Sequence, residues 1–498
     1  MIELKIRSQW RRGAFVLLFA GANVLMAQPG QFPPDRPPQP GALSLIPVPL
    51  PSNLTDFVVD QKAAIVLGKA LFWDQQAGSD GLACASCHFH AGADNRVINV
   101  LDPGLRNTDS TVQNIWNLTA SNKDNRVGPP PGGGPNYTLK KLDFPFHQLA
   151  DPTLRNSAVL CDSNDVVSST DVFRADFSHM NVKGNAKHEQ KKLEVCTAAL
   201  SPTFSVHGIN TRQVEPRNTP TVINAIFNFR NFWDGRANNV FNGRNPFGPR
   251  DPSAGIIPEA SVQVADFYGN LSPVPVSIPD ASLASQAVGP PGSDLELSCR
   301  GRVFEEIGQK LLSKKLQPLD GQEISPTDSV LGPYVDKKGN LTFSYEDMIK
   351  KAFPSKFWSS GHQTSDGYRQ IEKNFSLFWG LSIMLYESTL VSDNTPFDQY
   401  ANGNILAMTT QQATGFQVFL GNGGCVFCHK GAEFTGAATT LKQLKETGAQ
   451  IEHMLMGDGT VALPSTASTS SFRILRPPRT WREPGKGGWR SSTQPGLS

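Results

Sequence analysis

Apolar residues recur at helical spacing in two parts of this 498-residue chain. The spacing predicts a helix over Leu67–Asp74 and a longer amphipathic helix from Ile371 to Leu390. Residues 105–206 are polar and show little helical periodicity, so we expect irregular structure there. After about residue 463 the chain is rich in Ser, Thr, Pro, Gly and Arg, which predicts disorder or a segment outside the fold. The whole pattern predicts a mainly α protein with long irregular insertions.

Residues 1–27 have the pattern of a secretory signal peptide. Basic residues precede an apolar stretch from Ala14 to Met26 that is too short for a membrane span. We expect export by the general secretory route with cleavage after Ala27, and membrane attachment only if the signal is retained. Residues 28–53 are rich in proline and predict a linker.

Net charge changes this picture little. The formal charge is +2, and its positive excess lies at the two ends of the chain, so residues 28–463 are mildly acidic. A mildly acidic body argues against nucleic acid as a partner and would suit a basic redox protein.

The strongest chemical signal is a pentapeptide that occurs twice, as Cys84-Ala85-Ser86-Cys87-His88 and as Cys425-Val426-Phe427-Cys428-His429. C-x-x-C-H is the attachment site for c-type haem, where two thiols add to the vinyl groups of one porphyrin and the histidine ligates the iron. The alternatives are a redox C-x-x-C pair, a zinc half-site or chance. No second C-x-x-C lies close to either motif to complete a zinc site. We therefore predict two covalent haems with His88 and His429 as proximal iron ligands, which agrees with export.

A glycine and a phenylalanine one helical turn apart precede each motif. They are Gly68 and Phe72 before the first motif, and Gly415 and Phe419 before the second. In a cytochrome c fold, the N-terminal helix packs a small residue and an aromatic residue against the proximal side of the haem. The repeat therefore predicts two cytochrome-c-like haem domains in tandem.

The expected domains follow from the positions of the motifs. The first haem domain, with its insertions, covers residues 54–345, and the second covers residues 346–463. Residues 464–498 would form a disordered or non-native tail.

Three of the seven cysteines remain after haem attachment, namely Cys161, Cys196 and Cys299. An exported protein permits disulfides. Cys161 and Cys196 lie in the same polar stretch, so we expect a disulfide between them, worth about 3–4 kcal/mol in the loop-entropy model. Cys299 would then be a buried free thiol.

Further blocks beside the motifs carry a family resemblance. They are Leu67–Asp74, Arg217–Asn228, Phe232–Ala237, Phe397–Tyr400 and Gly424–Gly431. With the two motifs, these blocks resemble the bacterial di-haem cytochrome c peroxidase family, which includes the methylamine-utilisation-type di-haem enzymes. Insertions at about 105–206 and 244–280 separate the blocks. The resemblance implies a peroxidatic first domain and an electron-transfer second domain.

The resemblance also implies a peroxide pocket. The family uses a glutamine and, ten residues later, a glutamate, which Gln286 and Glu296 match here. Heterolytic cleavage of a peroxide requires a proton to move from one oxygen to the other, and a carboxylate can carry that proton. A glutamine amide can hold the peroxide without titrating. The alternative is a solvated pair on a loop.

Other residues receive roles from the resemblance alone. Trp233 would relay electrons between the haems, and Asn218 would be a side-chain ligand of a bridging calcium, which is a hard cation that needs several oxygens. His207 lies eleven residues before Asn218 rather than the eight of the family's removable distal histidine, so we interpret it as a surface residue. We interpret His90 and His453 in the same way.

These observations predict an exported, periplasmic di-haem peroxidase. Electrons from a small redox protein, a cytochrome c or a cupredoxin, would enter at the haem of His429 and reduce hydrogen peroxide at the haem of His88. The nearest alternative is a di-haem oxidase that uses peroxide to oxidise a protein or organic substrate. The alternative from another class is a non-catalytic electron-transfer cytochrome, in which two strong ligands close each iron.

The second haem has no clear distal ligand in the sequence. In the resembling family that ligand, usually methionine, comes well downstream of the second motif. The local candidates are Met454 and Met456, which we interpret as packing residues. We expect a five-coordinate or water-bound iron at His429, with a lower reduction potential than a His/Met haem.

Overall fold

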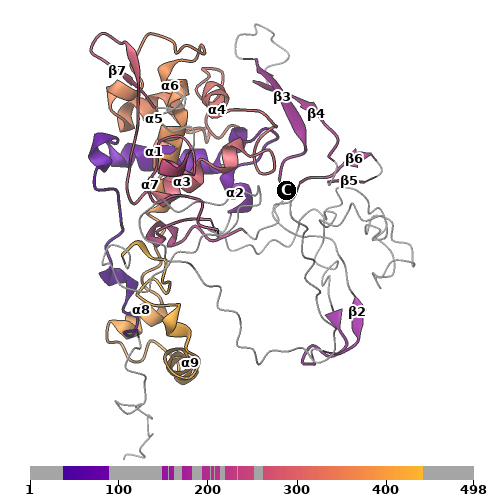
Figure 1. The fold of residues 1–498 in the computed structure, drawn as a ribbon, viewed down its shortest axis with the longest axis vertical. Coiled ribbons are helices and arrows are strands. Elements are labelled where there is room, and N and C mark those ends of the chain that lie inside the picture. Colours follow the sequence, from indigo (N-terminus) through magenta and orange to yellow (C-terminus); the bar gives the residue numbers. More distant parts are fainter. Residues whose placement is uncertain are drawn as a thin grey trace, which may run out of the picture.

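The computed structural model describes residues 37–88, 148–154, 156–161, 171–181, 193–201, 204–206, 208–213, 219–232, 234–251 and 262–440. Within these residues the α-helices are α1 (Gln61–Trp73), α2 (Cys84–Cys87), α3 (Ser282–Ala287), α4 (Phe304–Leu311), α5 (Tyr345–Ala352), α6 (Gln370–Lys373), α7 (Phe375–Glu387), α8 (Pro396–Ala401) and α9 (Thr410–Leu420). Figure 1 shows α1 and α3 to α7 gathered in one body, with α8 and α9 beyond its lower end.

Strands form only short antiparallel pairs among the described residues. The pairs are β1 (Gln148–Leu149) with β2 (Val159–Cys161), β3 (Ala175–Met180) with β4 (Glu194–Ala198), β5 (Ser205–Val206) with β6 (Ile209–Asn210), and β7 (Val262–Ala265) with β8 (Leu271–Val274). The structure is mostly helical with little sheet, so the mainly α prediction is confirmed. The tandem arrangement of two cytochrome-c-like domains stays a prediction.

Helix α1 begins where Asp60 caps it, since the Asp60 carboxylate accepts a hydrogen bond from the Ala63 N–H. The helix then crosses α7 at Gly68. A Cβ atom at Gly68 would lie 1.9 Å from the Ser382 carbonyl oxygen, so only glycine lets the two backbones approach this closely. This crossing brings the end of α1 and its Phe72 side chain toward the first C-x-x-C-H motif, whose His88 ring lies 6.3 Å from the Phe72 ring.

The prediction of one amphipathic helix from Ile371 to Leu390 is wrong in two respects. It is two helices, α6 and α7, and every residue of α7 is buried. The break falls at Asn374, whose side-chain amide donates to the backbone oxygens of Gln263 and Phe357. These bonds tie Asn374 to neighbouring segments, so Asn374 lies outside both helices. A helix that is apolar all round belongs at the centre of a core, and α7 lies there.

Helices α1 and α7 share one hydrophobic core with α3, α4 and α5. A smaller cluster surrounds α8 and α9, formed by Phe416, Leu420 and Val426 with Phe397, Tyr400, Met408 and Phe419 packed on it. Residues 346–390 therefore pack with the first motif, although the sequence assigned residues 346–463 to the second domain. We propose that the boundary between the two units lies near residues 391–395.

The two glycines that precede the motifs provide a matched pair of substitutions. Gly68→Ala should destabilise the protein by about 1–3 kcal/mol, because the new methyl group overlaps the α7 backbone. Gly415→Ala should be neutral or stabilise by up to about 1 kcal/mol, because the described residues leave open space there and alanine favours a helix. Thermal unfolding followed by circular dichroism measures both. Equal losses would contradict the difference between the two helix environments.

The described part of the proline-rich segment, residues 37–53, packs as an arm on the protein. Leu43 is 4% exposed, and its backbone N–H donates a 2.8 Å hydrogen bond to the Asp398 carboxylate at α8. The arm thus links the second motif's cluster to the main core. In the part of the chain that the structure describes, no helix combines the length and the apolar character needed to span a membrane.

The predicted Cys161–Cys196 disulfide is wrong, because Cys196 of β4 bonds to Cys299. Strand β3 explains this pairing. Its Asp176 forms a parallel bridge with Arg300, which brings the neighbouring Cys299 to β4 with its Cα atom 6.4 Å from that of Cys196. The bond closes a loop of 103 residues, worth about 4.7 kcal/mol in the loop-entropy model. Cys299 is buried as expected but is not a free thiol.

Candidate functional site

The first C-x-x-C-H motif lies on α2, directly beside α1. The His88 N–H donates to the Cys84 carbonyl at 2.9 Å, so the histidine completes the helical turn that carries both cysteines. The Nδ1 atom of His88 lies 3.0 Å from the Pro220 carbonyl oxygen. Pro220 belongs to the Arg217–Asn228 block, so this block supplies the backbone group that orients the histidine.

The second motif repeats this local geometry on the 3-10 helix η13 (Cys425–Phe427). The turn begins at Gly424, whose φ of 63° lies in the left-handed region that favours glycine. The His429 N–H donates to the Cys425 carbonyl at 2.9 Å, and its Nδ1 atom lies 3.0 Å from the Phe434 carbonyl oxygen. Among the described residues, His429 is exposed.

The two histidines therefore share one tautomer. A carbonyl oxygen can only accept, so each Nδ1 atom carries the proton and donates it, and each Nε2 atom keeps its lone pair. A histidine held this way is fixed in orientation and ready to ligate a metal through Nε2. Burial also lowers the pKa of His88, which favours the neutral ligand form. The haem-ligand prediction for His88 and His429 is consistent with this geometry.

The Cys84 thiol has the wrong electrostatics for a redox C-x-x-C pair. Burial is the main cause that raises its pKa, and the nearby Glu387 carboxylate raises it further. Reactive cysteines have lowered pKa values that favour the thiolate. A zinc site is equally unsupported, since among the described residues the only group of three potential ligands within reach of one metal ion is Glu194, Cys196 and Cys299.

A cavity of about 340 Å³ opens beside the first motif. Cys84, Cys87 and His88 line it together with Gln286 of α3 and Glu296 from the loop that follows α3. The structure thus brings five of the residues predicted from the sequence to one cavity. The second motif's Cys425, Cys428 and His429 lie apart from it, in the cluster around α9.

The cavity contains cations that suit the carboxylates of a haem. Arg230 lines it with a buried Nε atom that has no hydrogen-bond partner. Burial and the nearby Arg250 lower the pKa of Arg230 to about 10, so its guanidinium is still charged at neutral pH. Arg236 also lines the cavity, with its guanidinium 4.0 Å from the centre of the Phe232 ring and 3.0 Å from Asp234. A buried N–H group without a partner is costly, and an anionic group bound in the cavity would satisfy the Nε atom of Arg230.

The residues therefore fit a c-type haem at the first site. Cys84 and Cys87 would hold it covalently, His88 would ligate it, and Arg230 would meet its carboxylates. Mostly apolar side chains complete the wall, namely Phe72, Val222, Ala225, Leu283, Leu297 and Ile383. At the second site, Cys425, Cys428 and His429 offer the same three attachments.

Sequence reasoning missed Glu387, which lines the cavity from the end of α7. Burial raises the pKa of Glu387 to about 8, which favours the protonated carboxyl. The available signal was a single acidic residue at the end of a long apolar run. Arg230 was missed as well, because its burial depends on distant segments.

Several expected functional residues lie outside the described residues. They are Trp233, Asn218, His90, His207, His453, Met454 and Met456. The signal peptide 1–27 and the tail 464–498 also lie outside them. Trp233 is flanked by described residues, of which Phe232 lines the cavity.

Replacing Arg230 tests its role toward the haem. Arg230→Gln should lower the midpoint potential of the first haem by on the order of 50 mV, equivalent to roughly 1 kcal/mol for one electron, because a nearby positive charge favours the reduced form. Spectroelectrochemical titration measures the shift. Arg300→Gln, at an exposed arginine outside the cavity wall, is the control. An unchanged potential in Arg230→Gln would place this guanidinium away from the haem.

Two histidines have the same local geometry, and each ends a C-x-x-C-H turn, an arrangement typical of c-type haem proteins. Residues 179–405 match the family described as di-haem cytochrome c peroxidase. Both motifs lie outside this match, so the motifs and the match are separate observations. Over residues 179–405 the chain is therefore similar to the di-haem cytochrome c peroxidase family.

Individual relatives are similar to parts of the chain. The chain is 26% identical over 237 residues to the cytochrome c551 peroxidase of Pseudomonas aeruginosa, covering 48% of this chain and 42% of that protein. It is 24% identical over 233 residues to the cytochrome c peroxidase Ccp of Escherichia coli, covering 47% of this chain and 30% of that protein. A cytochrome-c peroxidase of Denitromonas iodatirespirans is 50% identical over 46 residues, covering 9% of this chain and 12% of that protein. The matches span less than half the length of these relatives.

Proposed function

We propose that the protein is an exported, periplasmic di-haem peroxidase that reduces hydrogen peroxide to water with electrons from a small redox protein. The observation that carries this proposal is the position of Gln286 and Glu296, which line the same cavity as Cys84, Cys87 and His88. Beside a haem site, a carboxylate can transfer the proton that peroxide cleavage needs, and an amide can hold the peroxide by hydrogen bonds.

Each residue of the cavity would perform a different part of peroxide reduction. Bound haem supplies the redox-active iron at which peroxide is reduced. The Gln286 amide holds the peroxide by hydrogen bonds. The Glu296 carboxylate accepts a proton from one peroxide oxygen and returns it to the other, so that water can leave. The Pro220 carbonyl keeps the proton of His88 on Nδ1 throughout.

The remaining parts of the proposal concern electron entry. Electrons from a cytochrome c or a cupredoxin would enter at the haem attached beside His429 and pass by Trp233 to the first haem. Asn218 would help to hold a calcium ion between the two. These roles rest on the family resemblance and on the order of the blocks along the chain.

One observation favours an enzyme over an electron carrier. A carrier closes each iron with two strong ligands, usually His or Met. Among the described residues that line the cavity, none other than His88 is a histidine or methionine. The remaining space is lined by polar groups that can act on a small oxidant. The alternative enzyme, an oxidase that uses peroxide on a protein or organic substrate, shares this cavity.

Steady-state turnover separates the two enzymes. The peroxidase should consume hydrogen peroxide in the presence of a reduced small cytochrome c or cupredoxin and should oxidise two donor molecules per peroxide. If peroxide is consumed only when an organic or protein substrate is added, the oxidase is the correct function.

A further inference from the structure

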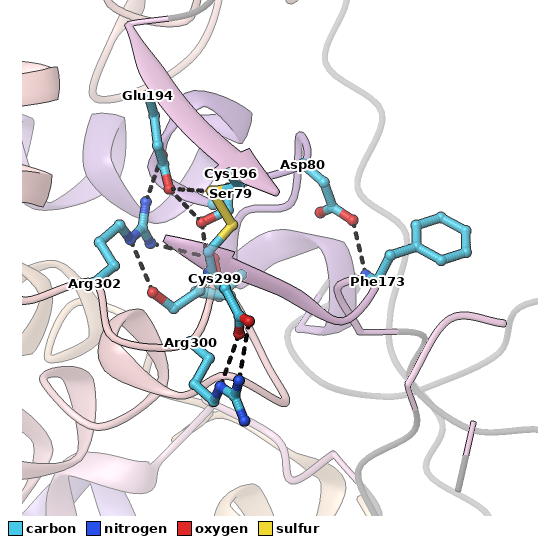
Figure 2. Close-up of a disulfide and its surroundings, with 12 residues drawn as sticks. Ser79, Asp80, Phe173, Glu194, Cys196, Cys299, Arg300 and Arg302 are labelled. Carbon is cyan, nitrogen blue, oxygen red and sulfur yellow. Dashed lines mark hydrogen bonds and ion pairs between the residues drawn. A yellow bond between two sulfur atoms is a disulfide. The ribbon is translucent and has the colours of Figure 1, made fainter. Parts of the chain in front are cut away.

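The loop that carries Glu296 is attached to the β3–β4 hairpin. This hairpin belongs to the polar insertion at about residues 105–206. Figure 2 shows the disulfide between Cys196 of β4 and Cys299, three residues after Glu296. Backbone bonds join the same two segments, since the Arg300 N–H donates to the Ala175 carbonyl and the Phe177 N–H donates to the Arg300 carbonyl. The hairpin is thus joined to the loop by a disulfide and by backbone hydrogen bonds.

Ser79, which precedes the first motif in the sequence, also holds the loop in place. Its backbone N–H donates to the Leu297 carbonyl at 2.9 Å, directly after Glu296. Its hydroxyl accepts from the Cys299 N–H at 2.8 Å and donates to the Glu194 carboxylate at 2.6 Å. One side chain therefore bridges the loop and the hairpin.

A buried arginine completes the attachment. The Arg302 side chain is 0% exposed and pairs at 2.9 Å with Glu194 of β4, which is 3% exposed. The same guanidinium donates to the Leu297 and Pro291 carbonyls, on either side of Glu296. Lys310 also pairs with Glu194, at 2.8 Å. Burial favours the neutral carboxyl, but the charges of Arg302 and Lys310 prevail and lower the pKa of Glu194.

This cluster is not a metal site. Glu194, Cys196 and Cys299 lie close enough to hold one ion. Their ligand atoms are already engaged, however, because the two sulfurs bond to each other and the carboxylate pairs with two cations. A dication would meet two positive charges already in place, which disfavours binding.

We propose that the β3–β4 hairpin is a positioning element for Glu296, which it holds in the haem cavity through the Cys196–Cys299 disulfide and the Glu194–Arg302 ion pair. The inference rests on the proposed role of Glu296 in peroxide cleavage. It assigns a catalytic purpose to an insertion that lines almost none of the cavity. None of these anchoring residues lines the cavity, so their effect must pass through Glu296.

A double-mutant cycle tests this inference. The Cys196→Ser, Cys299→Ser double variant should lower the rate constant for the reaction with hydrogen peroxide about 10- to 100-fold, because a misplacement of about 1 Å carries losses of that size. In the Glu296→Gln background, the same two serines should change the rate constant by less than about twofold, since no carboxylate is left to misplace. Haem content and both haem spectra confirm that each variant is loaded.

The outcomes separate the inference from the function on which it rests. Equal losses in both backgrounds, or no loss in either, overturn the positioning role. A Glu296→Gln variant as fast as wild type overturns the role of Glu296 and the inference with it. If the double serine variant fails to fold, Ser79→Ala in both backgrounds provides the same cycle, with an expected loss of about 3- to 10-fold for one hydrogen-bonding bridge.

Two controls accompany the cycle. Asp176→Asn removes an exposed ion pair with Arg300 on the same hairpin, where the side chains are 43% and 52% exposed, and should change the rate constant less than about twofold. Alkylation of the denatured holo-protein should label only Cys161 before reduction and also Cys196 and Cys299 afterwards, since the haems occupy the other four cysteines. Three labels before reduction would show that the disulfide is absent and would overturn the inference.

Discussion

Glu296→Gln is expected to lower the rate constant for peroxide cleavage by about 10²–10⁴-fold, the usual contribution of general acid–base catalysis. Glutamine keeps the shape and hydrogen-bonding capacity of the side chain but cannot carry a proton at neutral pH. Both haem spectra should stay as in wild type, because Glu296 lines the cavity without attaching the haem. Stopped-flow mixing with hydrogen peroxide measures the rate constant directly.

Asp294→Asn is the matched control for this substitution. Asp294 lies two residues away on the same loop, carries the same charge and is not among the residues that line the cavity. Its replacement should leave the rate constant within about threefold of wild type, since it removes a charge without removing the proton carrier. A loss below about threefold in Glu296→Gln would place this carboxylate outside the reaction, and the assignment of Gln286 would fall with it.

The second large effect is on haem attachment. Cys84→Ala and Cys428→Ala should each lower the ratio of covalent haem to protein from two to about one, because each removes one thioether from a different motif. Haem staining after denaturing electrophoresis and mass spectrometry measure the ratio. Wild type that releases its haem into acidified organic solvent after denaturation would contradict covalent attachment at both sites.

The two cysteine variants should differ in stability. Loss of haem at the first motif leaves a cavity of about 340 Å³ within the main core, and empty volume in a core is costly. The second motif's cysteines and histidine are exposed among the described residues, so loss of haem there disturbs less packing. Thermal unfolding of both variants is the measurement. A larger loss of stability in Cys428→Ala would contradict this difference between the sites.

Local spacing made the two C-x-x-C-H turns visible in the sequence, and the haems that they predict stay a prediction. A C-x-x-C-H turn is defined by five adjacent residues, and Gly68 with Phe72 is defined by one helical turn, so both are visible in the sequence. The ten-residue spacing of Gln286 and Glu296 was also visible, but only the fold shows that both line the cavity of the first motif.

Features that depend on distant segments were not predictable. Cys196 pairs with Cys299 rather than Cys161 because the bridge between Asp176 and Arg300 brings residues 103 positions apart into contact. The break before α7 depends on backbone oxygens that reach Asn374 from other segments. The burial that shifts the pKa values of Arg230 and Glu387 has the same origin.

The central claim is that the first haem reduces peroxide with electrons that enter at the second. Stopped-flow mixing of hydrogen peroxide with the half-reduced and the fully oxidised protein, followed by addition of a reduced cytochrome c, tests it most directly. The account predicts a rapid spectral change at the first haem of the half-reduced protein and sustained oxidation of the added cytochrome. A spectral change without oxidation of the cytochrome would indicate the oxidase. No reaction of either form with peroxide would contradict the account and leave an electron carrier.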